Sequence, residues 1–213
     1  QRGSGEQFSR PELEQLLAIP DDRLSSVTTL IGDPGSGKSA LLAMLGKRLI
    51  DLGYPVLAIN TRWSGARINT DNFFEIRRDI EAAVYTARAL GYRAIVLHGQ
   101  SLGNIHVQYY AANNWDRDIK AVVLTSMFAN LPWKSRHILV QNEEAFAELH
   151  DAALTALRER REAEVLAMRM QRTREEKEPV TSQHFLTYRA EESSTADGTY
   201  WIRRIPRPIL MVR

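Results

Sequence analysis

The stretch that decides the fold runs from Arg93 to Tyr110 and reads RAIVLHGQSLGNIHVQYY. Its segment Ala94–Leu97 is apolar throughout, which is typical of a strand that is covered on both faces. Residues Gly99–Gly103 then match the pattern G-x-S-x-G, and a helical pattern follows. A strand, a tight turn that carries a serine and a helix are the setting of a nucleophile elbow. We therefore predict a strained turn that presents Ser101.

Two residues of this turn have predicted roles. Ser101 would act as the nucleophile, and the small residues two positions before and after it would let the strand and the helix approach closely. The backbone N–H of Leu102, at the start of the helix, would point to the place where an oxyanion forms. The alternative is a glycine-rich turn that merely carries an exposed serine.

On the residues GQSLG, the chain resembles the α/β-hydrolase superfamily over about residues 53–213. This resemblance implies an esterase- or lipase-like acyl hydrolase that needs no cofactor and acts on a small-molecule ester or amide. It also implies a catalytic acid just after the seventh strand of the fold and a histidine after the eighth. Both would follow Arg213, where this sequence stops, so we expect an incomplete triad and impaired activity.

The composition of the chain excludes several classes of protein. It has 213 residues, a formal net charge of +2 and no cysteine, so disulfides and thiolate chemistry are excluded. No basic run is long enough to follow a phosphate backbone, and we expect no nucleic-acid partner. No apolar run approaches the roughly 20 residues of a membrane span. A cytoplasmic protein is the expectation.

Strands and helices are predicted to alternate along the first part of the chain. Such alternation implies a mostly parallel, doubly wound α/β sheet with right-handed crossovers. We expect an incomplete α/β-hydrolase-like sheet with a helical cap insertion. The predicted strands are Val27–Ile31, Pro55–Ile59, Ala94–Leu97, Ala121–Thr125 and Pro208–Val212, and the predicted long helices are Lys38–Leu52 and Asp71–Leu90.

The sequence suggests four segments. Residues 1–26 would form an N-terminal helical arm, and residues 27–130 the α/β core with both motifs. The resemblance to α/β hydrolases implies that residues 131–205 form a helical cap or lid, which that fold inserts between its sixth and seventh strands. Residues 142–174 fit this character, because they are rich in Arg and Glu with interspersed apolar positions that we interpret as mostly helical. Residues 206–213 would be a final core strand, which we interpret as truncated.

A second motif, GDPGSGKS over Gly32–Ser39, matches G-x-x-x-x-G-K-[ST] between a predicted strand and a predicted helix. Backbone N–H groups in such a loop cradle phosphates, its lysine reaches the β- and γ-phosphates, and its final hydroxyl holds Mg²⁺. The first sixty or so residues thus resemble P-loop ATPases, which implies binding of Mg-ATP or Mg-GTP. The implied nucleotide-binding residues are Gly32, Gly35, Ser36, Gly37, Lys38 and Ser39, with Ser39 also as the magnesium ligand.

Nucleotide turnover is not predicted, because it needs a carboxylate at the end of a neighbouring strand. The later strands end instead in Asn60, His98-Gly99 and Thr125-Ser126. The P-loop also occupies the position where an α/β hydrolase has its oxyanion loop. We therefore hypothesise a composite chain, with an ATPase-like front joined to a hydrolase-like body.

Three functions remain open at this point. The first is a serine hydrolase with Ser101 as nucleophile, the second a nucleotide-binding module, and the third an inactive fusion or fragment. The histidines bear on the first of these, because all of them precede the position where the family has its catalytic base. They are His98, His106, His137, His150 and His184.

Overall fold

A parallel β-sheet forms the centre of the fold. The computed structural model describes residues 26–31, 38–62, 69–126, 130–171, 177–191 and 194–212. Within these residues the sheet has five strands in the order β2-β1-β3-β4-β7, and every neighbouring pair is parallel. The strands are β1 (Ser26–Ile31), β2 (Val56–Ile59), β3 (Ala94–Gln100), β4 (Ile119–Thr125) and β7 (Ile209–Val212). The five predicted core strands are confirmed.

The order of the strands creates a switch point in the sheet. β1 pairs with β2 on one side and with β3 on the other, so the chain runs outward to β2 and then returns across β1 to β3. In open α/β sheets, ligands bind outside the carboxyl ends of the strands at such a point. The G-x-S-x-G turn follows β3, so the topology places it at this position.

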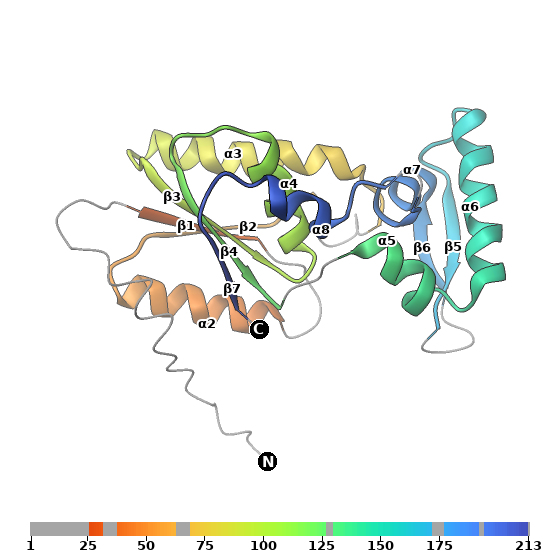
Figure 1. The fold of residues 1–213 in the computed structure, drawn as a ribbon, viewed down its shortest axis with the longest axis horizontal. Coiled ribbons are helices and arrows are strands. Elements are labelled where there is room, and N and C mark those ends of the chain that lie inside the picture. Colours follow the sequence, from red (N-terminus) through yellow and green to blue (C-terminus); the bar gives the residue numbers. More distant parts are fainter. Residues whose placement is uncertain are drawn as a thin grey trace, which may run out of the picture.

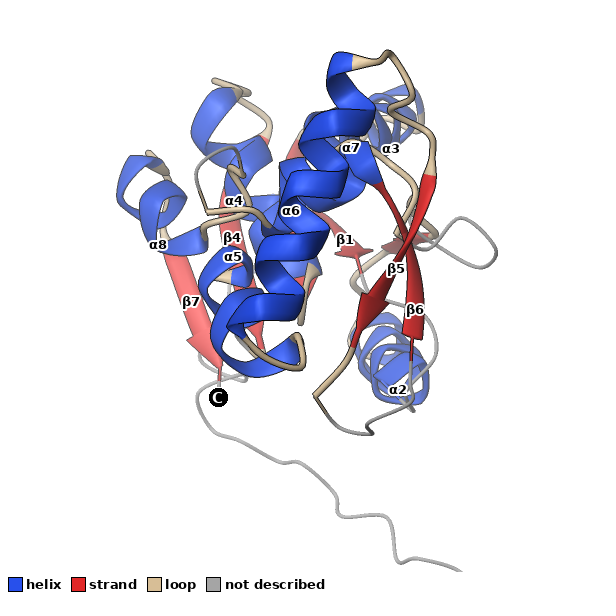
Figure 2. Ribbon diagram, turned by 90° about the vertical axis from the view of Figure 1, so that its right-hand side faces the viewer, coloured by secondary structure: helices blue, strands red, loops and turns tan. Residues whose placement is uncertain are grey.

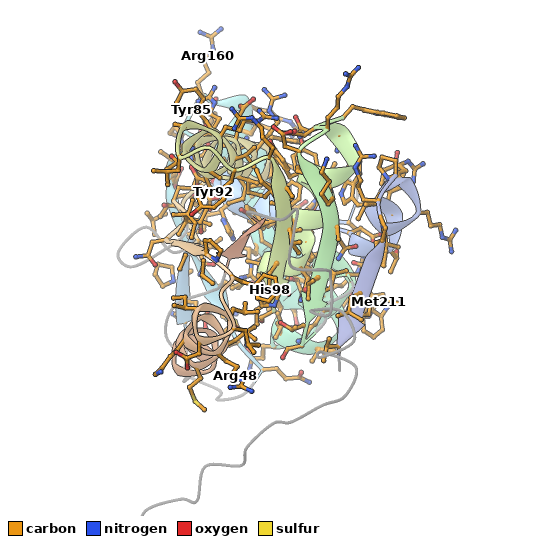
Figure 3. All side chains as sticks on the ribbon, turned by 90° about the vertical axis from the view of Figure 1, so that its left-hand side faces the viewer. Arg48, Tyr85, Tyr92, His98, Arg160 and Met211 are labelled. Atoms are coloured by element: carbon orange, nitrogen blue, oxygen red, sulfur yellow. The ribbon has the colours of Figure 1, made fainter. Side chains whose placement is uncertain are left out.

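Helices cover both faces of the sheet (Figure 1). α2 (Lys38–Asp51) lies on one face, and α3 (Ile76–Ala89) and α4 (Gly103–Asn113) lie on the other. Figure 3 shows the same layers end on, with Arg48 of α2 and Tyr85 of α3 on opposite sides of the strands. This arrangement is the predicted doubly wound α/β fold.

The main core lies between the sheet and the pair α3 and α4. α3 has apolar residues at helical spacing on one side, so it presents a continuous stripe to the strands. The buried members of this core are Ile76, Ile80, Val84, Ala87, Ile95, Leu97, Val107, Tyr110, Ala111, Ile119, Val122 and Leu124. Alternate residues of β3 point to opposite faces, so His98 points away from this core, toward the α2 side.

The segment between β4 and β7 contains a second layer, which we call the cap and define as residues 131–190. It consists of α5 (Leu131–Lys134), a π-helical turn (Ser135–Leu139), α6 (Glu143–Arg158), β5 (Val165–Arg169), β6 (Lys177–Thr181), α7 (Ser182–His184) and a second π-helical turn (Phe185–Arg189). The cap stands beyond the carboxyl ends of the sheet strands, with α6 on its outer side (Figures 1 and 2). α8 (Gly198–Trp201) then returns the chain to α4.

The expectation that residues 142–174 are mostly helical is wrong after Arg158. α6 ends at Arg158, and Arg160 takes a left-handed backbone with φ of 58°. β5 and β6 then pair antiparallel, with Leu166 opposite Val180. Met168 is buried in the cap while Val165 is 62% exposed, an alternation that fits a strand. β5 has only two inward positions, Leu166 and Met168. Two positions are too few for the sequence to distinguish the period of a strand from that of a helix.

The cap has its own apolar core. It lies between α6, the β5–β6 pair and the turn after α7, and it shares no buried residue with the core of the main sheet. Its buried members are Val140, Ala145, Phe146, Leu149, Ala153, Met168, Val180, Phe185, Leu186 and Ala190. The cap therefore has an apolar core of its own.

Several predicted features lie outside the described residues, including the N-terminal helical arm and Gly32–Gly37 of the P-loop motif. Within the part of the chain that the structure describes, no helix is long and apolar enough to span a membrane.

Candidate active site

The turn between β3 and α4, which is the predicted elbow, is strained at Ser101 and tightly packed at Gly99. Ser101 has φ of 55°, in the left-handed region that residues other than glycine rarely adopt. A Cβ atom on Gly99 would lie 2.4 Å from the carbonyl oxygen of Gly103 and 2.8 Å from the Cα of Asn104. The strand and the helix thus approach so closely that only glycine fits at position 99. The φ angle of Ser101 agrees with the predicted strain of this turn, and the distances at Gly99 agree with the predicted close approach of strand and helix.

Asn104 and Thr125 hold the strained turn in place. The Nδ2 group of Asn104, which is fully buried, donates to the carbonyl of Ser101 at 2.8 Å and to that of Thr125 at 2.9 Å. The same Thr125 carbonyl accepts the backbone N–H of Ser101 at 3.2 Å. The end of β4 is therefore joined to the elbow through backbone and side chain together. Sequence reasoning missed Asn104; its position three residues after the serine, in the first turn of a buried helix, was the available signal.

Leu102 lies at the N-terminus of α4, where its side chain is 5% exposed. The N-terminus of a helix carries partial positive charge and free N–H groups, which favour a developing anion. The Leu102 side chain packs in an apolar cluster with Phe73, Leu131 and Tyr188. Because Leu131 and Tyr188 belong to the cap, the cap covers the elbow directly.

A seam of hydrogen bonds joins the cap to the loop before α3. The backbone N–H of Thr181 donates to the carbonyl of Asn69 at 3.0 Å, and its hydroxyl donates to that of Thr70 at 3.1 Å. The Nε2 group of Gln183 donates to the same Thr70 carbonyl at 2.9 Å. The backbone N–H of Phe73 donates to the hydroxyl of Thr187 at 3.1 Å. Residues 69–73 are thus the platform on which the cap sits.

Four polar side chains meet in the buried part of this seam. The Tyr188 hydroxyl donates to Oδ2 of Asp71 at 2.8 Å and lies 3.2 Å from Nε2 of His106. Nδ1 of His184 donates to Oδ1 of Asp71 at 3.1 Å, and the His184 ring stacks on Tyr188 at 4.1 Å between centroids. Asp71 precedes α3, His106 lies on α4, and the other two belong to the cap. Contacts this distant in sequence gave no local signal.

Burial shifts the protonation of this cluster. It lowers the pKa of His106 to about 4, and it lowers that of His184 to about 4 in spite of the hydrogen bond to Asp71. Burial alone would raise the pKa of Asp71, but the bonds from His184 and Tyr188 bring it below its ordinary value. Around neutral pH the cluster therefore consists of two neutral imidazoles, the neutral Tyr188 hydroxyl and one carboxylate.

The other histidines occupy separate places. His98 lies on the α2 side of the sheet (Figure 3), where its Nε2 is 2.8 Å from the Thr125 hydroxyl and burial lowers its pKa to about 4. His137 is paired with Glu191 at 3.7 Å, and His150 with Asp151 at 3.8 Å. The structural role predicted for His98 and His106 is consistent with these contacts.

The nucleotide-binding residues predicted from the P-loop motif lie mostly outside the described residues. Lys38 and Ser39 are the first two residues of α2, and the motif thus connects β1 to α2. Gly32, Gly35, Ser36 and Gly37 are not described. Among the side chains that the structure does describe, no group of three or more His, Asp or Glu is placed to hold a metal ion.

Neither a protein-family model nor a curated protein matches the chain. Solved structures do match it. One is an α/β-hydrolase fold protein of unknown function, at 14% identity with a TM-score of 0.54, and the match covers 87% of this chain and 65% of that chain. A hypothetical protein from Pseudomonas aeruginosa matches at 13% identity and a TM-score of 0.52, over 92% of this chain and 78% of that one.

A putative hydrolase from Agrobacterium vitis S4 matches at 12% identity with a TM-score of 0.51, over 89% of this chain and 79% of that chain. Together with the parallel sheet and its flanking helices, these matches show that the chain has the α/β-hydrolase fold. It spans less than two thirds of the length of the first of these structures.

Proposed function

We propose that the protein is a serine hydrolase of the α/β-hydrolase fold, with Ser101 as nucleophile and a small-molecule ester or amide as substrate. The observation that carries the proposal is the left-handed backbone of Ser101 at the carboxyl end of β3, where the sheet has its switch point. A strained turn of this kind exposes a serine hydroxyl between a strand and a helix N-terminus. Backbone strain at a residue of suitable chemistry points to a functional role.

The chemistry would proceed through an acyl-enzyme. The hydroxyl oxygen of Ser101 attacks the substrate carbonyl carbon while a general base takes the proton. The N–H of Leu102 stabilises the resulting oxyanion, an interaction whose loss typically lowers the rate by about 10²–10³-fold. The leaving alcohol or amine departs with a proton, and water then hydrolyses the ester formed on Ser101.

Covalent labelling tests the proposal. The chain is incubated with a fluorophosphonate, which forms a stable adduct only with an activated serine, and its intact mass is measured. We expect one adduct on the unaltered chain and none on the Ser101→Ala variant. Ser126→Ala is the matched control, because Ser126 also has a left-handed backbone, with φ of 51°, just after a neighbouring strand. An unlabelled chain, or an adduct that survives Ser101→Ala, contradicts the proposal.

Nucleotide binding is the second candidate function. It is supported by the sequence motif Gly32–Ser39, which lies in the chain after the strand β1 and reaches the start of the helix α2, as a phosphate-binding motif requires. Calorimetric titration with Mg-ATP tests it. We expect heat of binding that Lys38→Ala abolishes and that Lys47→Ala, on the exposed side of the same helix, leaves unchanged. Absence of binding by the unaltered chain contradicts this candidate.

A further inference from the structure

We propose that Asp71, His106, His184 and Tyr188 form a proton-sensitive clasp, which holds the cap on the elbow at neutral pH and loosens it on acidification. The clasp would regulate access to Ser101, so that part of the inference rests on the proposed function. The clasp itself consists of contacts between the cap and the core.

The clasp joins the cap to two separate elements of the core. His106 belongs to α4 and Asp71 to the loop before α3, whereas His184 and Tyr188 come from the cap. His106 and His184 are each at most 2% exposed, and Asp71 is 8% exposed. The hydrogen bonds His184–Asp71, Tyr188–Asp71 and Tyr188–His106 all cross the boundary between cap and core. Lifting the cap would break all three.

The donors of the clasp lead to one carboxylate, that of Asp71, either directly or through the Tyr188 hydroxyl. Because the Tyr188 hydroxyl donates to Asp71, the neighbouring Nε2 of His106 must carry the proton that it shares with the Tyr188 oxygen. Nδ1 of His184 donates to the other carboxylate oxygen. Each imidazole thus already uses a proton in its neutral form. A further proton would make it a buried cation.

The charges around the clasp do not offset the effect of burial on the pKa values of the two histidines. Asp71 and Asp79 favour protonation of His106, whereas His184 opposes it. On the cap side, Asp71 favours protonation of His184 and the buried Arg189 opposes it. Arg62 also faces Tyr188 and is itself bound to Asp79. Burial is the largest influence on both imidazoles, so the seated cap favours their neutral forms.

The clasp lies directly against the predicted site. Tyr188 packs in one apolar cluster with Leu102, the residue that follows Ser101. His106 follows Ser101 by five residues, on the helix that the elbow begins. Release of Tyr188 would therefore expose the side chain of Leu102 and the turn that carries Ser101.

Hydrogen exchange as a function of pH tests the clasp without any need for catalysis. Amides of residues 69–73 and 181–190 report opening of the seam, and amides of β3 report the core. Exchange is corrected for its intrinsic pH dependence. If opening restores an ordinary histidine pKa near 6.5, the opening equilibrium should rise roughly twentyfold per released imidazole between pH 7 and pH 5. The core amides should change much less.

The variant His106→Gln/His184→Asn removes the titration but keeps an N–H donor near each original position. In this variant, seam opening should no longer depend on pH between 7 and 5. His137→Gln, which changes an exposed histidine of the cap, should behave like the unaltered chain. Seam exchange in the unaltered chain that is flat between pH 7 and pH 5 overturns the clasp. That result stands even if the double variant does not fold.

The same samples are labelled with the fluorophosphonate. Acid-induced seam opening without any labelling supports the clasp and contradicts the proposed hydrolase. Labelling without acid-induced opening overturns the clasp and supports the hydrolase.

Discussion

At the scale of single residues, the elbow depends on Gly99, Asn104 and Thr125 as well as on Ser101. A left-handed backbone at a residue such as Ser101 costs about 1–3 kcal/mol, so the surrounding structure must hold it. Gly99 permits the close approach of the strand to the helix, and Asn104 bridges the carbonyls of Ser101 and Thr125. The strain at Ser101 is thus offset by packing and hydrogen bonding within one turn of α4.

Asn104→Ala should therefore destabilise the fold and loosen the elbow. The variant loses the Nδ2 hydrogen bonds to the Ser101 and Thr125 carbonyls, each worth about 0.5–1.5 kcal/mol, although both carbonyls keep a backbone N–H donor. Urea unfolding measures the stability, and the rate of fluorophosphonate labelling measures the elbow. The matched control is Asn113→Ala on the same helix, because Asn113 donates to the Tyr109 carbonyl at 2.8 Å but is exposed. Equal behaviour of the two variants would show that Asn104 does not hold the turn.

At the scale of elements, the cap and the sheet have separate cores. The residues of the cap core pack among themselves. Other buried residues of the cap contact the main domain at residues 69–73 and in the cluster around Leu102. Opening at this seam would leave the packing inside each layer intact. We expect the cap to open at a lower free energy than the sheet.

Met168→Ala should weaken the cap selectively. Met168 is fully buried in the cap core, so its truncation removes apolar contacts and leaves a cavity, at a cost of about 2–5 kcal/mol. We expect faster hydrogen exchange in α6 and β6, with little change in β3 and β4. Val165→Ala, at an exposed position of the same strand, should alter neither region. An equal loss of protection in β3 would mean that cap and sheet unfold as one unit.

At the scale of the whole molecule, buried histidines make stability depend on pH. The pKa values of His98, His106 and His184 in the folded chain are about 4, below the ordinary value of 6.5. The unfolded chain therefore binds more protons between these two values. The stabilisation is complete above about pH 6.5 and is lost as the pH falls toward 4.

We accordingly expect the free energy of unfolding to fall between pH 7 and pH 5, by on the order of 2 kcal/mol for each of these histidines. Urea denaturation at several pH values measures this slope. His98→Asn, on the α2 side of the sheet, should reduce the slope without affecting the seam between cap and core. A free energy of unfolding that is constant from pH 7 to pH 5 would be inconsistent with three neutral buried imidazoles.

Much of this fold could be predicted from patterns within short windows of sequence. Ala94–Leu97 predicted a buried strand because both of its faces are covered, and Gly99–Gly103 predicted the strained turn. The strands β5 and β6 were missed, since their alternation is short and β6 contains Pro179. Apolar residues at a few positions fit both the period of a strand and the period of a helix, and only the partner strand distinguishes the two.

By itself, the sequence determined the order of strands and helices and the position of the strained serine, because periodicity and glycine placement act through neighbours in the chain. Only the tertiary structure decided which polar groups meet. Asp71 and His184 are 113 residues apart, and Asn104 reaches Thr125 across 21 residues. Such pairs form because a buried polar group has lost its hydrogen bonds to water and must find a partner within the protein. The packing of whole elements, rather than the local sequence, decides which partner that is.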